Sequence, residues 1–204
     1  MILETLIGDE KLIVECEAEL QPLATEVMRK LEAANAQGLA MRDGARVQLG
    51  WSVITLRADN GRLRVCEPAF NTNPFQLFTP TLDISLRLLD AQVRVLRRVK
   101  EEGVDVMFDQ IVLAARGALE VPDIYLKRLA PLQNEDSGWF IGDLNQIEDA
   151  TTEHTEAVPA FKLLRKREAV IQVLALPPGY IVTMKKDVID QVFDSNGQDR
   201  WQLQ

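Results

Sequence analysis

The chain has 204 residues and a formal net charge of −8, from 31 acidic and 23 basic residues. This acidic balance argues against a nucleic-acid-binding protein, because holding a phosphate backbone requires a basic surface. No stretch reaches the ~20 apolar residues of a membrane-spanning helix, and the first ten residues lack the basic start and apolar core of a signal peptide, so we expect a cytoplasmic protein without a membrane partner.

The N-terminal half carries the patterns of two amphipathic helices and a hairpin. Apolar residues recur at three- and four-residue steps, or their multiples, through residues 11–37, which predicts a helix ending before Gly38. Residues 46–67 alternate in the rhythm of strands, and Asn60-Gly61 suits a tight hairpin turn. A second helical stripe covers residues 82–100, and we interpret its basic residues as a solvated face.

The C-terminal half is predicted to be mostly β. Short strand patterns occupy residues 111–114, 124–126, 138–142, 180–184 and 188–192, with one short helix at 162–167. Residues 143–157 are acidic and poorly patterned, and Pro177-Pro178-Gly179 is a rigid turn. The chain is therefore predicted to be α+β, with antiparallel or mixed sheets. We expect a helix–hairpin–helix region over residues 1–105 and a second domain over 106–204.

No pattern indicates catalysis or cofactor binding. Cys16 and Cys66 form no CxxC pair, so we expect free thiols, with a redox pair as the alternative. His154 is the sole histidine and lies in a polar segment, where a general base is less expected than an exposed side chain. Phosphate-binding glycine motifs are absent. We therefore predict no catalytic residue, no metal and no cofactor, leaving open a hydrolase built around His154 and its acidic neighbours.

Several short motifs lie between residues 111 and 182. Tyr125-Leu126-Lys127-Arg128 combines a tyrosine with basic residues, and a Leu-Pro-x-Gly turn follows at Leu176 to Gly179. Between them lie an Asp-Ser-Gly-Trp motif and a Gly-Asp pair. The first consists of Asp136, Ser137, Gly138 and Trp139, and the second of Gly142 and Asp143. With these motifs the segment resembles a bacterial immunity-protein family of polymorphic-toxin systems, formerly described as a domain of unknown function.

The resemblance implies a small α+β domain that neutralises a toxin by binding it. The motif residues, together with Pro177 and Gly179, are then expected to be structural, with Trp139 in the core rather than at an interface. An acidic protein attracts a basic partner through a complementary field. The expected contact surface is acidic and consists of Asp143, Glu148, Asp149, Glu153 and Glu156. The alternative is a regulatory or ligand-binding module with another partner.

Overall fold

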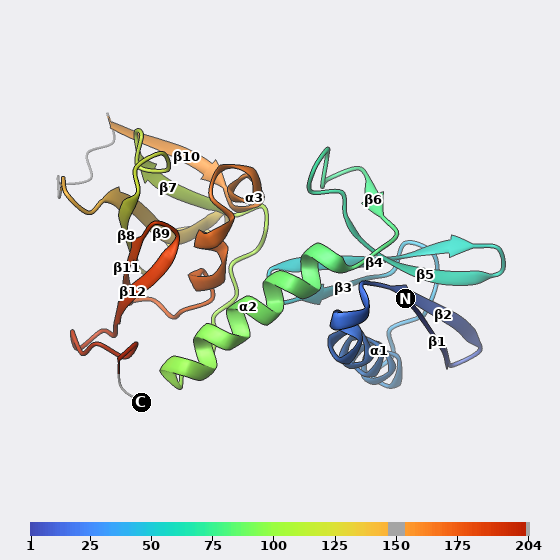
Figure 1. Cartoon of the computed structure of the whole chain (residues 1–204). Helices are drawn as coiled ribbons and strands as arrows, with labels where there is room; N and C mark the ends of the chain where they lie inside the picture. Colours follow the sequence, from blue (N-terminus) through green and yellow to red (C-terminus); the bar gives the residue numbers. More distant parts are fainter. Residues whose placement is uncertain (147–153, 203–204) are drawn as a thin grey trace. The chain divides into compact units, whose positions relative to one another are not determined.

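The computed structural model describes residues 1–146 and 154–202 and divides the chain into two compact units, Met1–Asp90 and Ala91–Gln204. Each unit combines a six-stranded sheet with helical segments (Figure 1), which confirms the predicted α+β class. The division falls within helix α2 (Asp83–Val99), whereas the sequence patterns suggested a domain boundary after residue 105.

The first unit is built on a mixed sheet in the order β1-β2-β5-β4-β3, with β6 also paired to β5. Neighbouring strands are antiparallel except for β2 and β5, which are parallel. Its elements are β1 (Ile2–Ile7), β2 (Glu10–Glu15), η1 (Ala18–Leu20), α1 (Gln21–Ala36), β3 (Arg46–Leu49), β4 (Ser52–Asp59), β5 (Arg62–Pro68), β6 (Phe78–Thr79) and the first half of α2.

The predicted helix over residues 11–37 is wrong in its first part. Helix α1 begins at Gln21, and residues 10–15 form β2, which pairs with β1 in a hairpin. The turn lies at Gly8-Asp9, since Ile7 pairs with Glu10. The pattern was misleading because Leu12, Ile13 and Val14 are all buried and show no two-residue alternation, whereas Leu12 also fits the helical spacing to Leu20.

The predicted hairpin over residues 46–67 is present, with its turn at Asn60-Gly61. Asp59 pairs with Arg62, and both turn residues have positive φ, as a tight two-residue turn requires. The first predicted strand is divided, however. A further turn at Gly50-Trp51 separates β3 from β4, and Leu49 pairs with Ser52 across it.

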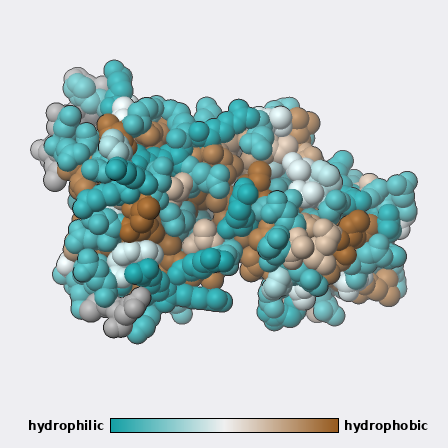
Figure 2. Space-filling view, in the orientation of Figure 1, coloured by the Kyte–Doolittle hydropathy of each residue, from teal (hydrophilic) through white to brown (hydrophobic). Residues whose placement is uncertain are grey.

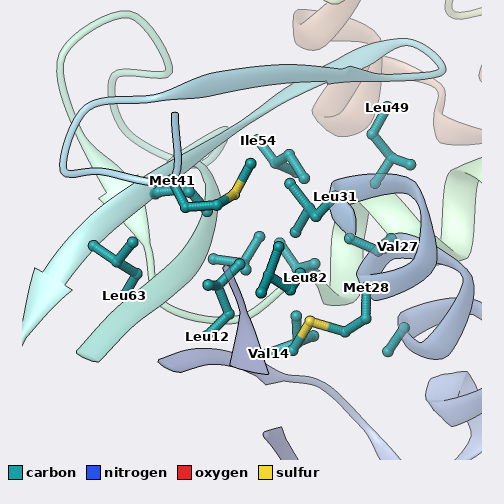
Figure 3. Packing of buried hydrophobic residues seen from close by; sticks show 14 of the residues in the cluster. Leu12, Val14, Val27, Met28, Leu31, Met41, Leu49, Ile54, Leu63 and Leu82 are labelled. Carbon is teal, nitrogen blue, oxygen red and sulfur yellow. The ribbon is translucent and has the colours of Figure 1, made fainter. Parts of the chain in front are cut away.

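The core of the first unit lies between α1 and the sheet. Val27 and Leu31 of α1 point toward Leu12 and Ile54 of the strands in Figure 3, and all four are buried. The carboxylate of Glu67, which is 1% exposed, accepts hydrogen bonds from the backbone N–H groups of Ile84 (3.3 Å) and Ser85 (2.7 Å). Because these donors are in the first turn of α2, Glu67 caps that helix.

The second unit contains a mixed sheet in the order β10-β7-β9-β8-β11-β12. Strands β7 and β9 are parallel, and the other neighbours are antiparallel. Its elements are the second half of α2, β7 (Ile111–Ala115), β8 (Asp123–Arg128), β9 (Asp136–Asp143), β10 (Thr155–Pro159), η3 (Ala160–Lys162), α3 (Leu163–Lys166), η4 (Glu168–Val173), β11 (Ile181–Lys185) and β12 (Val188–Phe193).

The two faces of this second sheet differ. On β8, Ile124, Leu126 and Arg128 are buried, whereas Tyr125 and Lys127 alternate with them and are more exposed. We call the buried side the inner face, and the side bearing Tyr125 and Lys127 the outer face. The segment from η4 to residue 176 contacts the inner face, because the carbonyl of Leu174 accepts hydrogen bonds from both Arg128 and Trp139.

Within the described residues, no helix has both the length and the apolar character needed to cross a membrane. The face of the molecule in Figure 2 is largely hydrophilic, with separate hydrophobic patches in both units.

Candidate functional site

The Asp-Ser-Gly-Trp motif forms an irregularity in β9. Ile111 of β7 pairs with Asp136 and Leu113 pairs with Phe140, so two steps along β7 correspond to four along β9. Gly138 lies within this bulge with φ +76°, and a Cβ there would overlap the backbone carbonyl oxygen of Leu129. Glycine is therefore required both by the left-handed backbone and by the close approach of a second chain segment.

Side chains of the same motif hold the bulge in place. The carboxylate of Asp136 accepts hydrogen bonds from the backbone N–H of Gly138 (2.8 Å) and of Leu132 (3.1 Å). The hydroxyl of Ser137 donates to the carbonyl of Ile111 at 2.6 Å and accepts from the N–H of Trp139 at 3.2 Å. The motif thus joins β7, β9 and the loop before β9.

Arg128 is the centre of the hydrogen bonds on the inner face, a role that its place in the Tyr125-Leu126-Lys127-Arg128 motif did not indicate. Its side chain is in the buried class at 2% exposure and donates to four backbone carbonyls at 2.5–3.2 Å. The acceptors are Val104, Ser137, Leu174 and Leu176. Burial lowers the pKa of Arg128 to about 10, so the guanidinium remains charged at neutral pH.

The Leu-Pro-x-Gly turn meets β8 at the same place. Gly179 donates its N–H to the carbonyl of Arg128 at 2.8 Å, and Arg128 donates its N–H to the carbonyl of Tyr180 at 2.9 Å. The indole N–H of Trp139, a residue that is 1% exposed, donates to Leu174 at 2.9 Å. Trp139 therefore packs in the core of the second unit, and the separated motifs converge on one buried region.

The outer face of the sheet carries a groove of about 660 Å³. Tyr125 and Lys127 of β8, Phe140 of β9 and Ile181 of β11 line it, and Leu113 of β7 borders it. Leu129, Ala130 and Leu132 of the following loop also line it, and the remaining lining residues are Asp136, Gly138, Trp139, Leu144 and Thr183. The groove is open, and most of the side chains that line it are apolar.

Gly142 of the Gly-Asp pair shapes one part of this groove. It is directly opposite Tyr125 across β8 and β9, and a Cβ on Gly142 would overlap the tyrosine ring. The ring therefore lies across the glycine and contacts Phe140, with 6.0 Å between ring centroids. The Tyr125 and Phe140 rings are tilted by 48°, a geometry that aromatic pairs favour.

One buried polar group in the groove lacks a partner. Thr183 of β11 is opposite Tyr125 and is 8% exposed, and its hydroxyl has no hydrogen-bond partner among the described residues. Such a group normally satisfies its hydrogen-bonding capacity with protein, water or ligand. The Thr183 oxygen is itself shielded from solvent, so it adds little polar surface to the groove.

The acidic residues expected to form the contact surface are only partly described. Asp143 ends β9 and accepts a hydrogen bond from the N–H of Asn145, and Glu156 of β10 forms an ion pair with Lys166 at 3.5 Å. Strand β7 lies between β9 and β10 in the sheet order. Glu148, Asp149 and Glu153 lie outside the described residues.

The two cysteines, His154 and the acidic side chains are the residues that could support redox, acid–base or metal chemistry. Cys16 and Cys66 are buried free thiols, and burial raises the pKa of Cys66 to about 11. The carbonyl of His154 accepts a hydrogen bond from the N–H of Arg116. Across residues 1–146 and 154–202, no group of three or more His, Cys, Asp or Glu side chains is arranged to hold a metal ion.

The comparisons with known proteins identify the segment that carries both the groove and the buried motifs. The model of the Imm33-like domain matches residues 91–195, which is just over half of the chain. No curated protein and no solved structure matches the chain. The match includes β7 to β12 and confirms the resemblance noted in the sequence, so the chain belongs to the Imm33-like domain family, a family of immunity proteins.

Proposed function

We propose that this protein is a non-enzymatic immunity protein that neutralises a cognate bacterial toxin by binding it. The observation that carries the proposal is an open apolar groove within the segment that matches the immunity-protein family. Clustered apolar side chains on a protein surface often mark a site for another molecule. A binding protein needs such a surface and no reactive group held in place.

The charge of one part of the second unit, residues 101–160, supports a protein partner of opposite sign. Residues 101–160 carry 13 acidic and 3 basic residues, and one of the basic residues is the buried Arg128. A surface of this charge accelerates encounter with a basic protein and disfavours acidic ones. We include the expected acidic contact residues Asp143, Glu148, Asp149, Glu153 and Glu156 in this role.

The first test separates stoichiometric binding from enzymatic removal of the toxin. The protein encoded beside this chain's gene is expressed in a bacterial host, and the chain is co-expressed at graded levels while growth is followed. A binding protein protects fully only near a one-to-one ratio, and size-exclusion chromatography then gives a complex of the two. Protection by far less than one equivalent, or absence of a complex, would contradict the proposal.

A second test addresses the acidic residues. Replacing Asp143, Glu148, Asp149, Glu153 and Glu156 by the corresponding amides should slow association with the toxin and reduce its dependence on salt. The rates are measured by surface plasmon resonance at two ionic strengths. An unchanged association rate at low salt would remove these residues from the proposed surface.

A further inference from the structure

We infer that the outer-face groove of the second sheet receives a basic segment of the partner protein that inserts two or three apolar side chains. This inference rests on the proposed function and names the surface and the chemistry of the partner. It concerns the face built by β7, β9, β8 and β11, which are neighbours in that order.

The apolar character of the occupant follows from what the groove exposes. Leu113, Leu129 and Leu132 are 40%, 56% and 91% exposed, and all three line it. They are three of the five exposed large apolar side chains described in the second unit, the others being Val104 and Val188. Covering them would remove from water the apolar area that this unit leaves most accessible.

The size of the groove distinguishes a segment from one side chain. A volume of about 660 Å³ exceeds what a single leucine or phenylalanine fills. The groove is also open rather than enclosed, so a chain can lie across it and insert successive side chains.

The basic character follows from the surrounding charge. Within the lining, Lys127 and Asp136 offset each other, and the negative charge beyond this pair comes from Glu135 beside the groove. Glu135 and Asp136 line an adjoining hollow of about 240 Å³, which shares Leu113 and Leu132 with the groove. A segment crossing both hollows is therefore flanked by carboxylates, which favour lysine or arginine next to the inserted apolar residues.

Three synthetic nonapeptides test the inference without the toxin. The first alternates lysine with leucine and phenylalanine, the second replaces its lysines by glutamate, and the third replaces its apolar residues by alanine. Each is titrated into the full-length isotope-labelled protein, and amide resonances are followed by NMR. The first peptide should shift resonances of β7, β8, β9 and β11, and the other two should bind at least about tenfold more weakly.

Variants of the protein locate the binding. Leu132→Asp and Leu113→Asp should weaken binding of the first peptide by about tenfold or more, since each puts a carboxylate in an apolar contact. Val188→Asp is the matched control, because Val188 is 67% exposed on β12 and does not line the groove. Lys127→Glu should strengthen binding, since it removes the positive charge of the lining. Because Leu132 is 91% exposed, Leu132→Asp should leave the fold intact, and it tests the groove even if Leu113→Asp destabilises the fold.

The outcomes separate this inference from the proposed function. Equal binding of the acidic and basic peptides, shifts outside the groove, or retention of a small apolar dye without any peptide binding would overturn the inference. Toxin binding that is unchanged in Leu132→Asp would also overturn it while leaving the proposed function intact. Groove binding of the basic peptide with no toxin binding would instead contradict the proposed function alone.

Discussion

Replacing Gly138 by alanine should destabilise the second unit by about 3–5 kcal/mol. An alanine held at the φ of +76° found here costs about 1–2 kcal/mol for the left-handed conformation alone. The new Cβ would also overlap the carbonyl oxygen of Leu129, so the backbone must move. Movement strains the hydrogen bonds from Leu129 to Gly138 and from Gly138 to Asp136, each worth about 1 kcal/mol.

Gly117→Ala provides the matched control for that variant. Gly117 lies in the same unit with φ +83°, and a Cβ there would meet no atom within 4 Å. Only the conformational cost of about 1–2 kcal/mol is expected. The free energy of unfolding is measured by urea denaturation, with the indole N–H resonance of Trp139 reporting on the second unit. Equal destabilisation by the two substitutions would refute the close contact with Leu129.

Three further predictions concern other features of the fold. Arg128→Met should cost about 2–4 kcal/mol, because four buried carbonyls lose their donor, and Arg128→Lys should recover part of that loss in urea denaturation. Burial raises the pKa of the Glu67 carboxyl to about 7, so between pH 4.5 and 7 the folded state holds a proton that the unfolded chain has released. The free energy of unfolding is therefore expected to fall as pH rises through this range. The decrease is at most roughly 3 kcal/mol, and Glu67→Gln should abolish it in thermal unfolding across that range, so a persisting slope would assign it to another group. Gly142→Ala should destabilise the sheet because its Cβ overlaps the ring of Tyr125, and Tyr125→Ala should relieve that penalty in a double-mutant cycle, whereas additive effects would contradict the contact.

Much of the secondary structure followed from local patterns. Helix α2, the Asn60-Gly61 turn and the strands β7, β8, β9, β11 and β12 were predicted close to where the structure has them. The hairpin of β1 and β2 was missed, because the buried run Leu12-Ile13-Val14 shows no two-residue alternation and Leu12 also fits the spacing of the helix that follows. The alternation on β8 predicted a strand, yet it gave no sign that Arg128 would be buried among carbonyls, since arginine is normally an exposed residue.

The position of α2 illustrates how a boundary can be concealed. The apolar stripe continues without a break along the helix, although Leu86 belongs to the core of the first unit and Gln92 bonds the carbonyl of Ile171 in the second. A periodic pattern records that one side of a helix is buried and does not record which core buries it. The two-domain division with a boundary after residue 105 therefore stays a prediction.

The sequence by itself determined the α+β class, the acidic charge and the motifs by which the chain resembles immunity proteins, because these depend on residue types and on spacings between near neighbours. Only the tertiary structure decided that Leu113, Tyr125, Phe140 and Ile181 share one groove. They come from four strands whose order, β7-β9-β8-β11, differs from their order in the chain. That order is set by the packing and pairing of distant segments, which no local pattern records.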